Sequence, residues 1–276
     1  MMKIIRVFPR KTSYTPNDPY AFVGDPPFTD WIPKADQVHV SVSFTWDIDE
    51  AFRIGGAWKQ YYPNTYVGGP ALDEYNSWDF TPNTYVKHGI TFTSRGCDNR
   101  CPWCLVPERE GKLKPIDITP GYIVQDNNLL QCTKDHLDRV FAMLRLQGRA
   151  IKFAGGLDSR LVNDYIVDQL KSITIDEVYL AADTVDSIKP LHKAVDKLKA
   201  LGRDKLRCYV LIGYNGEKLE QAIDRLEQVW EVGCLPFAQL YQPPDKFIKY
   251  PTEWKQLVRT WSRPAATKAI HKGVTS

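Results

Sequence analysis

The chain has 276 residues, of which 43% are hydrophobic and 25% are charged, and its formal net charge is +3. This composition is typical of a folded globular protein and excludes global disorder, and so small a net charge does not indicate a general nucleic-acid binder. No apolar run approaches the roughly 20 residues of a membrane-spanning helix, and the N-terminal apolar stretch is too short for a signal peptide. We therefore expect a cytoplasmic protein with no membrane partner, whose six cysteines are thiols rather than disulfides.

The first part of the chain, residues 1–87, is rich in Pro, Tyr, Asn and Asp. Apolar patterns within it predict strands and a helix that are separated by turn-rich loops. The predicted elements are strands at Lys3–Phe8 and Val38–Phe44, a helix at Ile48–Tyr61 and a short strand ending at Val67–Gly69. Their order indicates a small N-terminal α/β extension.

A regular alternation of short apolar segments and amphipathic segments begins at His88. The predicted strands are 89–94, 122–126, 150–155, 177–183, 206–213 and 236–241, and the predicted helices are 134–147, 163–172, 187–201, 218–232 and 253–261. Six strands alternating with helices predict a parallel sheet that curls into a partial (β/α)6 TIM-like barrel. We expect this barrel core over residues 88–245, followed by a C-terminal helix and basic tail over 246–276. Chemistry in such a sheet belongs at the carboxyl ends of the strands.

Three cysteines lie close together in the segment CDNRCPWC, as Cys97, Cys101 and Cys104. Thiolates suit both iron–sulfur clusters and zinc. A structural zinc site takes four ligands, and no fourth Cys or His follows at finger-like spacing. Three thiolates therefore indicate a [4Fe–4S] cluster with one iron open to a small chelating molecule, with a zinc knuckle or unrelated free thiols as the alternative. The other cysteines are scattered singly and are expected to be small buried side chains: Cys132, Cys208 and Cys234.

The Cys-x3-Cys-x2-Cys spacing, with the aromatic Trp103 before the last cysteine, resembles the radical S-adenosylmethionine (SAM) superfamily. The resemblance implies that the three cysteines hold the cluster and that the amino and carboxylate groups of SAM bind its fourth iron. It also implies that an electron donor such as flavodoxin or ferredoxin reduces the cluster, which then cleaves SAM to methionine and a 5′-deoxyadenosyl radical. That radical abstracts hydrogen from a substrate. Trp103 stands at the aromatic position that packs near the adenine in this family.

Weaker motifs of the same superfamily follow in order along the chain. Gly155 and Gly156 stand where the family has a Gly-Gly-Glu-like turn that meets the SAM amino group, and Leu157 replaces the glutamate. Asp183 stands where a polar residue bonds the ribose hydroxyls, although a helix N-cap or Asx turn explains this aspartate equally well. Positions that lie against the adenine in the family correspond to Ile212, Gly213, Leu240 and Tyr241.

Four polar residues near these motifs are candidates for contacts with a substrate: Arg95, Arg109, Asp126 and Asn127. The two arginines flank the cysteine loop, where they bind a substrate anion or lie in solvent as surface charges. Asp126 and Asn127 end the second barrel strand, where polar residues face a substrate or form a turn.

The N-terminal region suggests a branch of the superfamily. Residues 36–70 resemble the end of a cobalamin-binding domain, and Asp126–Asn128 resembles the B12-binding and methylthiotransferase-like branch. However, the chain has no Asp-x-His-x-x-Gly motif to supply a histidine to cobalt, and no cysteine precedes Cys97. We therefore expect a shortened remnant that packs on the barrel, no bound cobalamin and no methylthiotransferase activity.

The C-terminal stretch 246–276 holds seven Lys or Arg residues against one acid. It is either a basic, partly disordered tail or a segment that contacts nucleic acid through phosphates and stacking. The leading hypothesis is a radical SAM enzyme that abstracts hydrogen from an unidentified substrate: a nucleic acid base, a peptide or a small metabolite. The alternatives are a non-catalytic zinc- or cluster-binding nucleic-acid module and a radical SAM methyltransferase.

Overall fold

The computed structural model describes residues 2–27, 32–72 and 82–272. Contacts between Cα atoms divide the chain into two compact units, one reaching Ile90 and including Glu108–Glu110, the other formed by Thr91–Pro107 and the residues from Gly111 onward. Each unit has its own hydrophobic core. None of the helices within the described residues combines the length and apolarity that crossing a bilayer requires.

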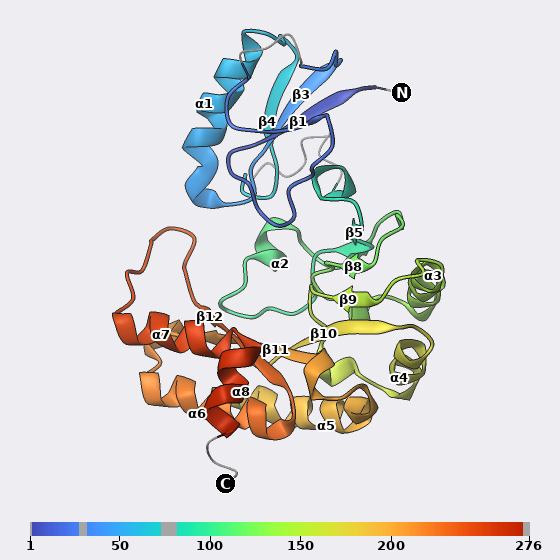
Figure 1. Ribbon diagram of the computed structural model, residues 1–276, viewed down its shortest axis with the longest axis vertical. Coiled ribbons are helices and arrows are strands. Elements are labelled where there is room, and N and C mark those ends of the chain that lie inside the picture. The colour runs from blue at the N-terminus through green and yellow to red at the C-terminus, as the bar shows by residue number, and fades with distance from the viewer. Residues whose placement is uncertain (1, 28–31, 73–81, 273–276) are drawn as a thin grey trace. The chain divides into compact units, whose positions relative to one another are not determined.

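The first unit is a four-stranded parallel sheet with one long helix (Figure 1). In sheet order its strands are β2 (Ala21–Val23), β1 (Ile4–Phe8), β3 (Gln37–Ser41) and β4 (Thr65–Gly68), and the helix is α1 (Ile48–Lys59). These elements confirm the predicted α/β extension. The short edge strand β2 was not predicted, because its three residues lie between turn-rich segments and pair only with β1.

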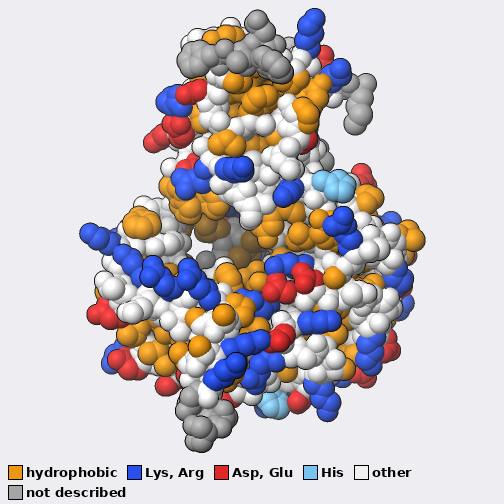
Figure 2. Space-filling view, viewed as in Figure 1, with side chains coloured by type: hydrophobic (Ala, Val, Ile, Leu, Met, Phe, Trp, Pro, Cys, Tyr) orange, Lys and Arg blue, Asp and Glu red, His pale blue; other side chains and the backbone are white. Residues whose placement is uncertain are grey.

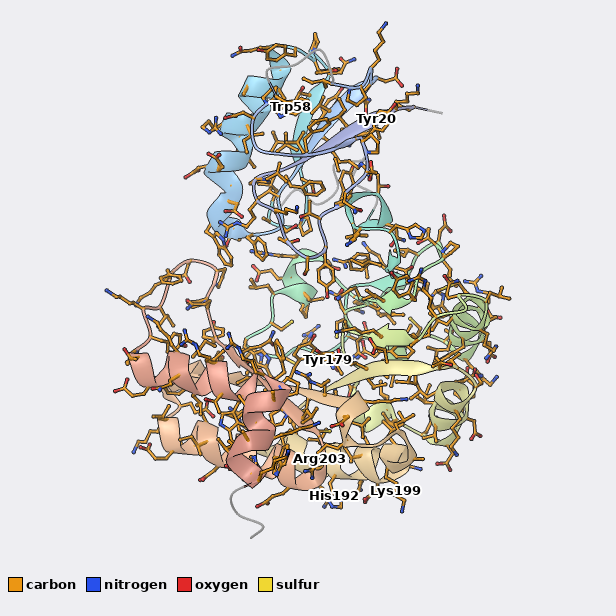
Figure 3. All side chains as sticks on the ribbon, viewed as in Figure 1. Tyr20, Trp58, Tyr179, His192, Lys199 and Arg203 are labelled. Carbon is orange, nitrogen blue, oxygen red and sulfur yellow. The ribbon has the colours of Figure 1, made fainter. Side chains whose placement is uncertain are left out.

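The core of this unit follows from the alternation of the strands. Alternate residues of β1 and β3 pack with the apolar stripe of α1, and the fully buried members include Val7, Val40, Ile54 and Trp58. The indole N–H of Trp58 donates to the Gly24 carbonyl at 2.9 Å, so this large side chain is both packed and hydrogen-bonded (Figure 3).

The second unit is built on a six-stranded sheet whose strands lie side by side in the order in which they follow one another along the chain. The strands are β5 (Ile90–Thr91), β8 (Ile123–Val124), β9 (Ile151–Phe153), β10 (Ile175–Ala181), β11 (Leu206–Ile212) and β12 (Leu235–Leu240). The pairs from β8 to β12 are parallel. The predicted α/β fold with a parallel sheet is thereby confirmed, and the carboxyl ends of the strands share one edge.

Helices connect these strands and cover one face of the sheet (Figure 1). They are α3 (Lys134–Arg145), α4 (Asp164–Lys171), α5 (Ile188–Leu198) and α6 (Leu219–Val232), with α7 (Thr252–Trp261) and α8 (Pro264–Lys272) following β12. The core between sheet and helices contains three buried thiols, which confirms their prediction as small hydrophobic side chains: Cys132, Cys208 and Cys234.

The face of the sheet opposite these helices carries aromatic and charged side chains. The rings of Tyr179 and Tyr209 stack with centroids 4.6 Å apart, and the Phe237 ring meets Tyr209 edge-on at 5.6 Å. Figure 3 shows Tyr179 on this side of the unit. The buried Arg207 lies next to these rings and pairs with Glu177 at 3.3 Å. This arrangement gives the sheet a second packed face.

The predicted strand 89–94 is wrong in its extent. It divides into β5 and β6 (Ser94–Arg95), and β6 pairs antiparallel with β7 (Lys114–Pro115) outside the main sheet. The physical reason is that the Thr93 N–H donates at 2.6 Å to the carboxylate of Asp126 instead of to a neighbouring strand. The chain therefore leaves the sheet at Thr93, just before the cysteine loop.

Residues 264–272 of the basic C-terminal stretch form the helix α8, so the alternative of a partly disordered tail is wrong for this part of the stretch. The Thr267 side chain is fully buried and donates to the Thr260 carbonyl at 3.0 Å. The His271 ring stacks on Trp230 with centroids 4.0 Å apart and contacts Glu227 at 2.8 Å. These contacts tie α8 to α6, so the positive charge of this segment does not prevent it from folding.

We predict that Trp58→Ala lowers the free energy of unfolding by about 3–5 kcal/mol, because it leaves a cavity in the first unit and removes the bond to Gly24. Trp46→Ala, at a tryptophan that is 62% exposed, should change it by no more than about 0.5 kcal/mol. Urea unfolding followed by circular dichroism measures both values. Equal losses in the two variants would contradict the assignment of Trp58 to the core.

Candidate functional site

A cavity of about 570 Å³ lies at the carboxyl ends of β9 and β10 in the second unit. Its volume is in the range of small-molecule and cofactor sites. The lining comes from the cysteine loop, from Asn127–Asn128 and from the turns after the two strands. Eight of the residues predicted from the sequence are brought together here: Cys97, Cys101, Trp103, Cys104, Asn127, Gly155, Gly156 and Asp183.

The cysteine loop is held in place by its backbone. Gly96 has a φ of +77°, and a Cβ atom there would lie 2.2 Å from the Lys112 carbonyl oxygen, so only glycine fits. The Cys97 N–H donates to the Gly111 carbonyl at 3.2 Å, and the Cys104 N–H donates to the Cys101 carbonyl at 3.0 Å. The second bond closes a tight turn that turns Cys101 and Cys104 into the same cavity.

The three thiols are close enough to influence one another. Cys97 and Cys101 are partly buried and Cys104 is exposed. Burial raises the pKa of the Cys101 thiol, and the negative charges of Cys104, Asp183 and Cys97 raise it further. A cationic metal centre bound to these sulfurs would relieve that repulsion.

Two kinds of metal site place different needs on the donor groups of the second unit. Over the described ranges, no three or more His, Cys, Asp or Glu side chains are grouped so that they could hold a metal ion. In a [4Fe–4S] cluster each thiolate binds a different iron, so such a cluster needs its sulfur atoms farther apart than they stand around one zinc ion.

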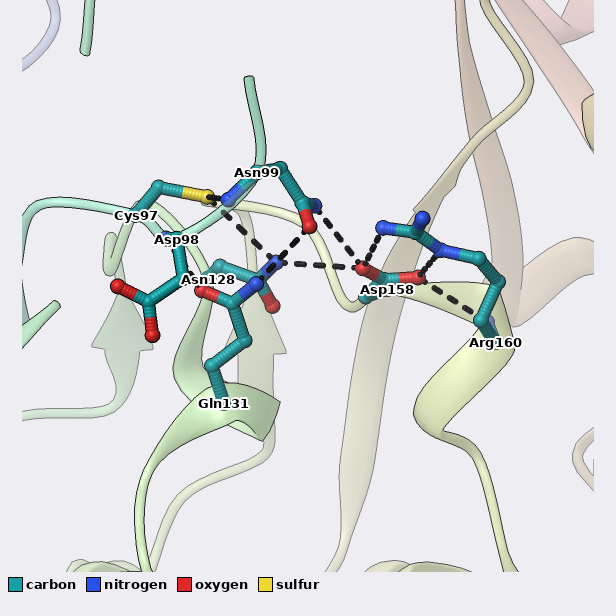
Figure 4. A network of polar contacts seen from close by, with 7 residues as sticks. All are labelled: Cys97, Asp98, Asn99, Asn128, Gln131, Asp158 and Arg160. Atoms are coloured by element: carbon teal, nitrogen blue, oxygen red, sulfur yellow. Dashed lines mark hydrogen bonds and ion pairs between the residues drawn. The ribbon is translucent and has the colours of Figure 1, made fainter. Parts of the chain in front are cut away.

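Amide side chains connect Cys97 to a carboxylate across the cavity (Figure 4). The Asn99 backbone N–H donates to Cys97 Sγ at 3.4 Å, and the Asn128 side-chain Nδ2 lies 3.8 Å from the same sulfur. Both amide side chains also donate to Asp158 Oδ2, Asn99 at 3.1 Å and Asn128 at 3.3 Å. Gln131 completes the network by donating to Asn99 Oδ1 at 3.0 Å. The cysteine loop and the turn after β9 are therefore joined by one hydrogen-bond network.

Asp158 is an ionised carboxylate in this network. Burial raises its pKa, but hydrogen bonds from Arg160 and Asn99 and the charge of Arg160 outweigh that effect and lower the pKa to about 2. Arg160 forks onto the carboxylate and donates from Nε at 2.8 Å, while its guanidinium lines the cavity. The turn thus presents a fixed ion pair to whatever occupies the cavity.

Two buried polar atoms at this cavity have no hydrogen-bond partner within the part of the chain that the structure describes. They are Asn128 Oδ1 and Ser159 Oγ, whose residues are 4% and 8% exposed and line the cavity. An unsatisfied buried polar atom costs about 1–3 kcal/mol, so such atoms point to a polar ligand. The cavity therefore fits an occupant with hydrogen-bonding groups of its own.

The backbone geometry of the turn after β9 requires glycine at both positions 155 and 156. A Cβ atom at Gly155 would lie 2.0 Å from the Asp126 carbonyl oxygen, and Gly156 has a φ of +93°. Leu157, which stands where the family has glutamate, is 2% exposed and packs in the core. The carboxylate at this turn belongs instead to Asp158, which lines the cavity.

Asp183, which follows β10, also lines the cavity. Its carboxylate accepts a hydrogen bond from the Leu211 N–H at 2.9 Å and another from the Trp103 side chain. Burial raises its pKa despite these bonds and the nearby charge of Arg225. The N-cap alternative is not observed, because the cap of the following turn is Thr184 and the Asp183 carboxylate bonds to β11 instead.

The four residues expected against the adenine are not in the described lining of this cavity: Ile212, Gly213, Leu240 and Tyr241. Ile212 is fully buried in the core, and Gly213 is packed so closely that a Cβ atom there would lie 2.7 Å from the Tyr250 hydroxyl. Tyr214 contacts Trp103 at 5.5 Å and Tyr241 at 4.9 Å between ring centroids. A row of contacting aromatic rings therefore connects the cysteine loop to the end of β12. Tyr214 was not predicted as a site residue, because its neighbour Trp103 is 111 positions away in sequence.

The substrate candidates separate into two groups. Asn127 lines the cavity. Asp126 is 1% exposed and its carboxylate is occupied by Thr93 and Ser94, so its role here is structural. Arg95 is 8% exposed and its guanidinium lies 4.6 Å from the Phe92 ring centre. Arg109 ends the short helix α2 (Val106–Arg109) and belongs to the first unit.

Other cavity residues were not among the predicted site residues. They include Arg100, Asn128, Asp158, Ser159 and Arg160. Asn128 and Asp158 directly follow predicted site residues or motifs, so their proximity in sequence was an available signal. Arg160 gives no such signal, because its importance depends on the ion pair with Asp158.

Basic residues of the C-terminal segment lie on the surface of the second unit. Figure 2 shows Lys and Arg side chains gathered over the loop after β12 and over α7. Lys255, Arg259 and Arg263 are exposed, and no ion pair of theirs is found among the described residues. Lys268, by contrast, is paired with Asp204.

Comparisons with known proteins add no relative. No protein-family model matches this sequence, and no match to it is found among curated proteins. The function of the site must therefore be inferred from its own residues.

We predict that Asp158→Asn lowers the free energy of unfolding at pH 7 by about 1 kcal/mol, allowing for screening at the exposed Arg160 guanidinium. The folded-state pKa of about 2 lies below the ordinary 3.8, so this stabilisation is complete above about pH 5 and is lost as the pH falls toward 2. The difference in unfolding free energy between wild type and variant, measured by urea unfolding, should therefore narrow as the pH falls.

Lys189→Gln, a surface change on α5, provides the control and should show a constant offset across the same pH range. A gap between wild type and Asp158→Asn that stays constant or widens in acid would refute the ion-pair assignment.

Proposed function

We propose that this chain is a radical SAM enzyme, in which Cys97, Cys101 and Cys104 hold a [4Fe–4S] cluster and the adjoining cavity binds SAM. The observation that carries the proposal is the convergence of three thiols from one short loop on a cavity at the carboxyl edge of a parallel sheet. The unsatisfied Asn128 and Ser159 atoms support a polar occupant for that cavity. When bound, a reduced cluster supplies the electron that cleaves SAM to methionine and a 5′-deoxyadenosyl radical, which takes hydrogen from the substrate.

The chain's own residues would bind and orient SAM. Gly155 and Gly156 allow the backbone to approach the amino acid part of the ligand, because neither carries a side chain on the cavity side. Asp183 is held by Leu211 and Trp103, so its remaining acceptor capacity suits the two hydroxyls of a ribose. Trp103 offers a ring for the adenine, and it is itself held against Tyr214.

The two units have different parts in this proposal. The sequential strand order of the second unit supports a sheet that curls into a partial barrel. We propose that the first unit is a shortened cobalamin-domain-like region that binds no cobalamin. His39 supports this, because it is fully buried and its ring nitrogens bond to the Tyr85 hydroxyl at 2.6 Å and Gln37 at 2.8 Å, which leaves neither for cobalt.

The residues of the cavity say less about the substrate and the partners of the protein than about the reaction that we propose. A nucleic acid base, a peptide and a small metabolite are the three classes we propose, and the exposed Lys255, Arg259 and Arg263 favour a polyanion among them. Free thiols at all six cysteines suit a reducing, cytoplasmic setting, where a flavodoxin or ferredoxin would be the electron donor.

We predict that Cys101→Ala loses the cluster and all SAM cleavage, because two thiolates cannot hold a cubane that is open at a further iron. Cys132→Ala, at a buried thiol outside the described cavity lining, should keep wild-type iron content. Iron and sulfide analysis after anaerobic reconstitution, with chromatography of 5′-deoxyadenosine, measures both properties. Full iron content and full SAM cleavage in Cys101→Ala would refute the assignment of Cys101 as a cluster ligand.

We also predict that Asp183→Ala weakens SAM binding about tenfold or more while the cluster still assembles, since a hydrogen bond to a charged group contributes about 1.5–3 kcal/mol. Asp186→Ala, at an exposed aspartate on the same cavity, should have a smaller effect. Isothermal titration calorimetry on the reconstituted proteins gives the two affinities. An unchanged affinity in Asp183→Ala would count against the ribose contact.

A further inference from the structure

Asn128 occupies an unusual position between two negative groups. Its side-chain amide Nδ2 lies 3.8 Å from Cys97 Sγ and 3.3 Å from Asp158 Oδ2. The residue is only 4% exposed, so water does not compete freely for these contacts. Because both acceptors are negative when ionised, the amide must turn its N–H₂ group toward them and its oxygen away. Figure 4 shows this amide between the cysteine and the aspartate.

The backbone holds this amide rigidly. Asn128 follows β8 and directly precedes the turn Leu129–Gln131, whose Gln131 N–H donates to the Asn128 carbonyl at 3.2 Å. Leu129 and Leu130 anchor that turn in the hydrophobic core. The side chain is therefore preorganised by packing.

We propose that Asn128 is a positioning residue that sets the reduction potential of the cluster through its hydrogen bond to Cys97, an inference that rests on the proposed function. Reduction adds an electron to the cluster and makes its thiolate ligands more negative. A hydrogen-bond donor aimed at a ligand sulfur stabilises that reduced state and raises the potential. The Asn99 backbone N–H acts on the same sulfur, but substitution cannot remove it.

Asp158 acts in the opposite direction. Its carboxylate lies one hydrogen bond beyond Asn128 and is ionised, so its charge disfavours the reduced cluster. Arg160 compensates for part of this charge from the solvent side. The two ends of the same bridge therefore shift the potential in opposite senses, which a purely structural role for the network does not predict.

The test is a potentiometric titration of the reconstituted full-length chain, followed by electron paramagnetic resonance. Asn128→Leu should shift the reduction equilibrium toward the oxidised cluster by about tenfold, which is about 59 mV for one electron. Asp158→Asn should shift it the other way. Asn127→Ala is the matched control, since Asn127 lines the same cavity and the structure shows no bond from it to a cysteine sulfur. Iron content per chain is measured in every sample.

An unshifted potential in Asn128→Leu at full iron content overturns the inference, and so do shifts of the same sign in Asn128→Leu and Asp158→Asn. If Asn128→Leu does not assemble a cluster, Asn128→Asp is measured instead, because aspartate keeps the shape of the side chain and replaces the donor by a negative charge. Asn128→Asp should lower the reduction potential further than the loss of the hydrogen bond alone. An unchanged potential in Asn128→Asp also overturns the inference. A wild-type chain that takes up no iron removes the proposed function itself. If the wild-type chain assembles a cluster and cleaves SAM, but the variants leave the reduction potential unchanged, only the role of Asn128 is refuted.

Discussion

The geometry of the site depends on the buried carboxylate of Asp126. This carboxylate accepts the Thr93 N–H at 2.6 Å, the Thr93 hydroxyl, and the Ser94 hydroxyl at 3.0 Å. Burial raises its pKa and these bonds oppose that rise, so the group is stable there only because its hydrogen bonds are made. The bonds take the chain out of the sheet at Thr93, and the cysteine loop begins three residues later.

Other parts of the site follow from that constraint. The Asp126 backbone passes so close to Gly155 that a side chain there would collide with it, so the turn after β9 can form only with glycine. Asn128, two residues beyond Asp126, then reaches both Cys97 and Asp158. One buried carboxylate thus places the cysteine loop, the glycine turn and the bridging amide relative to one another.

Much of the fold could be predicted from the sequence, because its signals are local. Strand and helix periodicity located the six parallel strands, and the cysteine spacing located the loop that lines the cavity. The break at Thr93 could not be predicted, since it depends on a hydrogen bond to a residue 33 positions later. The helix α8 was missed for a similar reason: its stability depends on Trp230 and Glu227, which lie in α6.

The cysteine loop of the candidate site could be predicted from the sequence, and the residues around it less so. Glycine and aspartate at strand ends indicated Gly155 and Asp183, whereas composition alone could not tell that Asp126 faces inward and Asp158 faces the cavity. That difference depends on which donors each carboxylate meets. Tyr214 has a role only through Trp103, which is distant in sequence, and Arg160 only through Asp158, whose own orientation depends on the fold.

The most direct test of the account is anaerobic reconstitution of the wild-type chain with iron and sulfide, followed by reduction with dithionite in the presence of SAM. A [4Fe–4S] cluster held by three cysteines requires about four irons and four sulfides per chain, and we expect 5′-deoxyadenosine to form. A colourless protein that binds one zinc ion and forms no 5′-deoxyadenosine would contradict it.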